Sequence, residues 1–162
     1  SELENYSAWE QLYAANPDAK AMIGLCAPDV ASLGKLNAAN GDKFIAGGYD
    51  LTEQNLAAIK DGHAYVTIGQ SPFVQGYLPI ALLANAAKSG KALEVGFYDS
   101  GAQIVTAESV DMGNGLPPVS FDEALKLAAD PAATAEYYKP WIATLTPEFL
   151  AAKPAPISAE SE

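Results

Sequence analysis

The amino-acid sequence predicts an α/β fold, a three-layer α/β/α sandwich with a mainly parallel sheet and right-handed crossovers. Short apolar runs alternate along the chain with longer segments whose apolar residues recur at helical spacing. The short runs lack polar alternation, which is typical of parallel strands that are covered on both faces. The 162 residues, of which 49% are hydrophobic, are about the size of one domain with a packed core.

The first half of the chain gives the clearest alternation of elements. A helix is expected from Tyr6 to Asn16, where the following proline ends it. A strand over 21–26 follows, and a second helix begins at Asp29 and ends at Asn40-Gly41. Residues 44–48 form the next expected strand.

A third helix is expected to start in Asp50-Leu51-Thr52-Glu53, a capping box in which Asp50 stands in for serine or threonine. Residues 64–69 then read as a strand. A long and largely apolar helix is expected over 73–89, closed by Gly90.

After this helix the elements become shorter. Two strands are expected over 93–97 and 103–106, around the turn composition Asp99-Ser100-Gly101. A loop then leads to two helices, over 121–130 and 132–144. The tail from Lys153 is rich in Ala, Pro, Ser and Glu.

Composition excludes several functions. The net charge is −11 and all nine cations are lysines, so nucleic acids and acidic membranes are disfavoured as partners. The single cysteine, Cys26, cannot form an internal disulfide or a multi-thiolate metal site. No Gly-x-Gly-x-x-Gly, phosphate loop or Gly-x-Ser-x-Gly elbow occurs, so we expect neither a cofactor, nor a metal, nor an enzyme.

The predicted fold brings three loops to one edge of the sheet, because ligands of open α/β sheets bind beyond the carboxyl ends of the strands. These loops hold Ala27-Pro28-Asp29, Tyr49-Asp50 and Gln70. A carboxylate accepts two hydroxyl hydrogen bonds, and an amide both donates and accepts them. Tyr49 and Phe73 offer aromatic faces for a sugar ring. This set predicts a site for a neutral polyhydroxylated ligand such as a sugar.

Simpler interpretations of the same residues stay open. Asp50 could serve only as a helix cap, and Gln70 only as a turn residue. Tyr49 and Phe73 could belong to the core. Glycoside hydrolysis normally needs two carboxylates that face each other across the bond, and of Asp50 and Gln70 only Asp50 supplies one.

Six segments together resemble the ribose-binding-protein-like family, the type I periplasmic solute-binding proteins that deliver sugars to ABC transporters. The resemblance covers about residues 5 to 110 and rests on the order and spacing of the six. They are Asn16-Pro17-Asp18-Ala19-Lys20-Ala21-Met22-Ile23, Ser32-Leu33-Gly34, Gly48-Tyr49-Asp50, Ala57-Ala58-Ile59-Lys60-Asp61-Gly62, Val66-Thr67-Ile68-Gly69-Gln70 and Gln75-Gly76-Tyr77-Leu78-Pro79.

The resemblance implies two lobes around a hinge, with Asp50 and Gln70 binding the hydroxyl groups of a sugar between the lobes. It also implies a periplasmic or lipid-anchored extracellular location and an ABC transporter permease as partner. Many family members have an asparagine where this chain has Ala27-Pro28-Asp29, and an autoinducer-binding branch has a similar Cys-Pro-Asp loop. The resemblance therefore leaves two classes of ligand open, sugars and autoinducers.

Measured against the family, the chain resembles a fragment. Residues 1–110 would form a partial C-terminal lobe, and within them the helix in 71–90 would belong to the other lobe. Residues 111–162 would be a helical extension and tail that pack on the lobe. The apolar helix over 73–89 would need a cover, either the missing N-terminal lobe or a second copy.

Two other functions remain as alternatives. The effector-binding domain of a lactose-repressor-like transcription regulator shares the implied fold, and an upstream helix-turn-helix would distinguish it. The chain could also be a fragment that binds nothing and self-associates through its uncovered surface.

Overall fold

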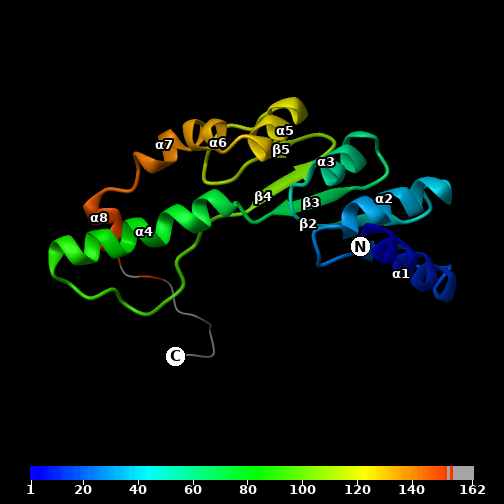
Figure 1. Ribbon diagram of the computed structural model, residues 1–162, viewed down its shortest axis with the longest axis horizontal. Helices are drawn as coiled ribbons and strands as arrows, with labels where there is room; N and C mark the ends of the chain where they lie inside the picture. Colours follow the sequence, from blue (N-terminus) through cyan, green and yellow to red (C-terminus); the bar gives the residue numbers. More distant parts are fainter. Residues whose placement is uncertain (153, 155–162) are drawn as a thin grey trace.

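A five-stranded sheet lies at the centre of the computed structural model, which describes residues 1–152 and 154 (Figure 1). The strands follow the order β1-β2-β3-β4-β5. The first three are parallel, and β4 and β5 each join antiparallel. Their bounds are β1 (Ala21–Ile23), β2 (Ile45–Tyr49), β3 (Val66–Gly69), β4 (Gln103–Thr106) and β5 (Val110–Asp111). The predicted α/β class is thereby confirmed.

Eight helices connect and cover these strands within the described residues. The first five are longer than seven residues, whereas the last three are short. The helices are α1 (Glu2–Ala15), α2 (Asp29–Ala39), α3 (Glu53–Lys60), α4 (Pro72–Ser89), α5 (Phe121–Ala129), α6 (Pro131–Tyr137), α7 (Lys139–Ile142) and α8 (Pro147–Leu150).

The largest core lies between the sheet and the helices α2, α3 and α5, which cover one of its faces. Val30 and Leu33 of α2 and Ile59 of α3 are completely buried there. Gly48 of β2 allows α2 to approach closely, because a Cβ atom at this position would lie 2.9 Å from Val30 Cγ2. The predicted apolar stripes of the second and third helices therefore face the sheet.

The opposite face of the sheet is left open by the described residues. Ile23 and Ile45 are each 52% exposed on this face, and Ile104 is 48% exposed. Residues 1–152 and 154 thus supply two of the three predicted layers, one helical layer and the sheet.

Helix α4 extends beyond the sheet and packs against the C-terminal helices (Figure 1). Val74, Leu78 and Leu82 bury one side of α4 in a second apolar cluster with Tyr138 and Trp141. On another side, Ile80 is 69% exposed and Leu83 is 59% exposed. The chain itself therefore covers part of this helix, which was expected to need another lobe or copy.

The sequence prediction was wrong in the C-terminal part of the chain at two places. Residues 93–97 form no strand, because only Phe97 makes an isolated bridge and Val95 is 89% exposed. The expected helix over 132–144 is divided into α6 and α7 at Tyr138. Pro140 fits the division, because proline lacks the amide hydrogen that a continuous helix would use at this position and is tolerated in the first turn of α7.

Residues after 110 also do more than pack as an extension. Val110–Asp111 form β5, and the α5 helix covers the sheet together with α3. None of the helices in the described part of the chain is both long enough and apolar enough to cross a membrane.

Candidate ligand-binding site

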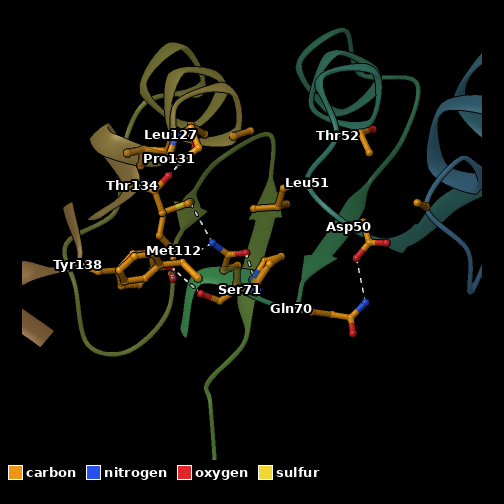
Figure 2. Close-up of a pocket in the computed structure, with 16 residues that line it drawn as sticks. Asp50, Leu51, Thr52, Gln70, Ser71, Met112, Leu127, Pro131, Thr134 and Tyr138 are labelled. Carbon is orange, nitrogen blue, oxygen red and sulfur yellow. Dashed lines mark hydrogen bonds between the residues drawn. The ribbon is translucent and has the colours of Figure 1, made fainter. Parts of the chain in front are cut away.

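Asp50 and Gln70 meet at the carboxyl ends of β2 and β3. The two strands are paired in parallel with Tyr49 opposite Ile68, so the residues that follow them come side by side. Gln70 Nε2 donates a hydrogen bond to Asp50 Oδ1 over 2.9 Å (Figure 2). Within the described residues, this bond leaves the other carboxylate oxygen of Asp50 and the amide oxygen of Gln70 without a hydrogen-bond donor. The predicted convergence of the two polar groups is thus present in the fold.

The backbone of Asp50 is held in an uncommon conformation. Its φ angle is +72°, in the left-handed region that most side chains avoid. Its amide donates to Ile68 O over 2.8 Å, and its carbonyl accepts from Thr67 Oγ1 over 2.9 Å. Strained backbone that is fixed by its surroundings is characteristic of functional sites. The surrounding hydrogen bonds fix the direction of the carboxylate.

Asp50 does not cap the following helix, contrary to the sequence prediction. The cap is Thr52, whose side chain accepts a hydrogen bond from the Asn55 amide over 3.1 Å. A residue at the N-cap normally has extended backbone angles, which Thr52 has and Asp50 does not. The carboxylate of Asp50 is therefore free of the helix terminus.

Asn55 joins two of the three loops of the site, and sequence reasoning missed it. The residue is completely buried, and its amide nitrogen lies 2.9–3.0 Å from the carbonyl oxygens of Ala27, Tyr49 and Asp50. Its Oδ1 atom accepts from the Ala31 amide over 3.0 Å. An asparagine three residues after a helix cap carries no sequence signal of this role, because its partners lie in two other loops.

A second polar network lies next to Gln70. Ser71 has a φ angle of +47°, and its amide donates to Gln103 Oε1 over 3.1 Å. Ser71 Oγ and Gln103 Nε2 both donate to the hydroxyl of Tyr138, which in turn donates to Met112 O over 3.0 Å. Burial raises the pKa of Tyr138, so the hydroxyl stays protonated and the network intact. This network fixes the turn between β3 and α4.

These loops and the C-terminal helices line an open cavity of about 630 Å³. Figure 2 shows Asp50 and Gln70 on one side of the site and Leu127, Pro131 and Thr134 on the other. Residues from both halves of the chain line the cavity. They are Ala27, Asp50, Leu51, Thr52, Gln70, Ser71, Pro72, Phe73, Gln103, Met112, Ala124, Leu127, Ala128, Pro131, Thr134 and Tyr138.

The other predicted site residues are placed differently from one another. Ala27 and Phe73 line the cavity with Asp50 and Gln70. Phe73 also stacks on Tyr138, with ring centroids 5.3 Å apart. Pro28 lines a smaller neighbouring hollow of about 210 Å³. Tyr49 ends β2 half-buried, outside the residues that line either space.

Asp29 is turned into the protein and away from the cavity. It is 5% exposed, and its carboxylate accepts from Asn5 Nδ2 over 2.7 Å, from Trp9 Nε1 over 2.9 Å and from the Cys26 amide over 2.7 Å. With these donors in place, Asp29 fastens α1 to the start of α2. The structure gives it a role in the fold.

The cavity combines the carboxylate of Asp50 and the amide of Gln70 with mainly apolar walls. Among the described residues, no group of three or more His, Cys, Asp or Glu side chains is placed to hold a metal ion. The polar atoms without a partner among the described residues are a carboxylate oxygen of Asp50 and the amide oxygen of Gln70, and they lie beside aromatic and apolar walls. This combination is typical of small-molecule sites. Such atoms match the hydroxyl groups of an uncharged ligand.

Comparison with known proteins identifies relatives for the part of the chain that carries this site. The family described as periplasmic binding protein domain matches residues 1–92. The xylose/arabinose-binding protein XylF of Sulfolobus acidocaldarius is 28% identical over 114 residues, which are 66% of this chain and 28% of that protein.

Two solved structures share the fold. One is a carbohydrate transporter solute-binding protein from Agrobacterium radiobacter in complex with D-arabinose, with 26% identity and a TM-score of 0.54. The other is a putative LacI transcriptional regulator from Bacteroides fragilis, with 26% identity and a TM-score of 0.51. The alignments cover 64% and 65% of this chain, and 35% and 36% of those chains.

The chain thus spans about a third of the length of these relatives. Because the family matches more than half of the chain and includes the loops that carry Asp50 and Gln70, the protein belongs to the periplasmic binding protein domain family.

Proposed function

We propose that this chain forms one wall of the sugar-binding cleft of an ABC transporter substrate-binding protein. The observation that carries the proposal is the Asp50–Gln70 pair, held at the carboxyl edge of the parallel strands by a strained and hydrogen-bonded backbone. Two relatives support a pentose as ligand, since one is named for binding xylose and arabinose and another was solved with D-arabinose.

In this proposal the pair binds hydroxyl groups directly. The unpartnered oxygen of Asp50 accepts a hydrogen bond from one hydroxyl, and the amide oxygen of Gln70 accepts from a second. Ala27 and Phe73 line the same cavity, and Phe73 supplies an apolar surface for the sugar ring. Among the described residues, no second carboxylate lines the cavity, so the proposed role is binding without catalysis.

The second wall of the cleft would come from another lobe. Helix α4 leaves the sheet beside the site and exposes Ile80 and Leu83, which we assign as a contact surface for that lobe. A sugar held by both lobes favours the closed form because its affinity for that form is greater. The closed form would then be presented to a membrane permease, which places the protein outside the cytoplasm, in the periplasm or anchored to the cell surface.

The similarity to a putative LacI regulator supports a second candidate, an effector-binding domain of a transcription regulator. Such a domain would bind a sugar at the same edge of the sheet but act on DNA through a helix-turn-helix. The net charge of −11 favours the transport protein. A mobility-shift assay with the protein at its natural length distinguishes the two, because only the regulator binds DNA.

The site is tested by replacing Asp50 with glycine and titrating D-xylose and D-arabinose calorimetrically into the protein at its natural length. Asp50→Gly removes the carboxylate and also relieves the left-handed strain. Loss of a charged hydrogen bond to the sugar is expected to weaken binding about 10- to 100-fold. The midpoint of thermal unfolding without sugar should not fall.

Asp42→Gly is the matched control. Asp42 also has a left-handed backbone, with a φ angle of +53°, but it pairs with His63 on the surface away from the cavity. This variant should bind pentoses as the unaltered protein does. Equal affinity of the Asp50→Gly variant, or failure of the unaltered protein to bind any sugar or polyol, would contradict the proposal.

A further inference from the structure

The cavity continues past Asp50 and Gln70 into an apolar chamber. We define the apolar chamber by Leu51, Met112, Ala124, Leu127, Ala128 and Pro131. Leu51 comes from the loop before α3, and the other five come from the chain after β5 and from helices α5 and α6. Figure 2 shows Leu51 between the Asp50–Gln70 pair and the side chains of Met112, Leu127 and Pro131.

The chamber is made largely by a part of the chain that the family match does not reach. The match ends at residue 92, whereas five of the six chamber residues follow residue 110. The family match therefore does not account for the chamber, and its chemistry has to be derived from its own side chains.

The chamber floor is preformed and apolar. Ala124 is 1% exposed, and Leu127 and Met112 are each 4% exposed, so these side chains are fixed by packing. Ala128 and Pro131 lie at the accessible rim. A ligand group that enters the chamber would remove this remaining apolar surface from water, which is favourable in proportion to the area covered.

The polar atoms around the chamber are already engaged by the protein. Thr134 Oγ1 donates to Leu127 O over 2.6 Å, and the Tyr138 hydroxyl is bonded to Ser71, Gln103 and Met112. A sugar hydroxyl in this space would give up its water without gaining a partner, which is unfavourable. An apolar group would not incur that cost.

We propose that the apolar chamber binds an apolar substituent carried by the sugar, so that the preferred ligands are alkyl or aryl glycosides of a pentose. This inference rests on the proposed sugar-binding function, because the Asp50–Gln70 pair would hold the sugar ring while the substituent enters between Leu51 and Leu127. The volume of about 630 Å³ lies in the range of sites for ligands larger than one sugar ring.

The test compares methyl and phenyl D-xylopyranosides, each as both anomers, by calorimetric titration into the protein at its natural length. For one anomer, the phenyl glycoside is expected to bind at least about tenfold more tightly than the methyl glycoside, by the usual effect of a larger apolar group in a hydrophobic pocket. Phenol alone serves as a control for the substituent without the sugar.

A matched pair of variants locates the effect. Ala128→Trp places a large side chain in the chamber, whereas Ala129→Trp makes the same change on the neighbouring exposed residue, which does not line the cavity. The first variant should lose the phenyl preference and keep its affinity for the methyl glycoside, and the second should keep both. If Ala128→Trp does not fold, Leu51→Ala removes one wall and should reduce the preference.

The outcomes separate the two proposals. Tight binding of the methyl glycoside with no gain from the phenyl group would overturn the apolar chamber and leave the sugar site standing. A phenyl preference that persists in Ala128→Trp would overturn it as well. Failure of both glycosides and of free pentoses would overturn the proposed function, and this inference with it.

Discussion

Asn55 holds two loops of the candidate site together although it does not line the cavity itself. Its amide group lies within hydrogen-bonding distance of three carbonyl oxygens from two loops, and its oxygen accepts from the first turn of α2. Through these contacts Asn55 sets the separation between the loop at Ala27 and the strained backbone of Asp50. We regard it as a positioning residue.

Replacing Asn55 with alanine is expected to lower the free energy of unfolding by about 2–3 kcal/mol, because buried carbonyl and amide groups lose their partner. Urea denaturation measures the change. Asn40→Ala is the control, since Asn40 makes a side-chain hydrogen bond to Leu36 O at the end of α2 and is only partly buried. A loss for Asn55→Ala no larger than for Asn40→Ala would show that these contacts between the two loops are not important for stability.

Asp29 gives the protein a dependence of stability on acid. Burial by itself raises the pKa of the Asp29 carboxyl, but hydrogen bonds from Asn5, Trp9 and the Cys26 amide outweigh burial and lower that pKa below its usual value. A carboxyl with a lowered pKa in the folded state stabilises the protein fully above its unfolded pKa of about 4. That contribution is lost as the pH falls through the folded pKa.

The difference in thermal midpoint between the unaltered protein and Asp29→Asn should therefore shrink as the pH is lowered from about 6 to about 2.5. Differential scanning calorimetry at a series of pH values measures this difference. A gap that stays constant over the whole range would mean that the charge on Asp29 does not contribute.

The positions of single residues were predictable from the sequence where the residues directly follow a predicted strand. Asp50 and Gln70 could be expected to meet because parallel strands bring their carboxyl ends to one edge. Asp29 lies in a loop of the same kind, yet its side chain turns inward. The hydrogen-bond donors that hold it there come from Asn5 and Trp9, which precede it by 24 and 20 residues. Sequence spacing holds no information about such distant partners, and Asn55 was missed for the same reason.

The C-terminal helices depend on Tyr138 for their position. Its ring is buried against α4, and its hydroxyl links the turn at Ser71 with Gln103 of β4 and the carbonyl of Met112. This one side chain therefore connects α4, the sheet and the junction of α6 and α7.

Tyr138→Phe is expected to lower the free energy of unfolding by about 1–3 kcal/mol, because the buried polar groups of Ser71 and Gln103 lose an acceptor. Tyr137→Phe is the matched control, since its hydroxyl bonds to Pro117 O at an exposed position. The control should lose less than about 1 kcal/mol in the same urea denaturation. Equal losses for the two variants would contradict the network.

Helices and strands were predictable where periodicity was long and regular. Helices α2, α3 and α4 and strands β1 to β4 lie where the pattern placed them, with ends shifted by a few residues. The strand predicted over 93–97 is absent. A pattern of apolar residues predicts strand propensity, but a strand also needs a neighbouring strand with which to pair. The two-residue strand β5 and the single-turn helix α8 are too short to give a periodic signal.

The chain as a unit has two apolar surfaces that its described residues leave open. One is the face of the sheet with Ile23, Ile45 and Ile104, and the other is the side of α4 with Ile80 and Leu83. Contiguous exposed apolar surface is typical of interaction sites. The chain spans about a third of the length of its relatives. We propose that the second lobe covers the exposed apolar side of α4.

The fold class and the contact between Asp50 and Gln70 were within reach of the sequence because both depend on local pattern and strand order. The apolar chamber was not, since it is formed between Leu51 and helices more than 70 residues later. Residues after 110, which the sequence suggested would only pack on the lobe, supply seven of the sixteen cavity residues. Their contribution emerges only when the C-terminal helices are folded against the sheet.

The central claim is that a sugar binds at the carboxyl edge of the parallel strands. Hydrogen–deuterium exchange of the protein at its natural length, with and without saturating D-xylose, tests this most directly. We predict slower exchange in peptides covering 47–52 and 69–73, and no change in α1. Protection confined to other segments, or no protection at any sugar concentration, would contradict the account.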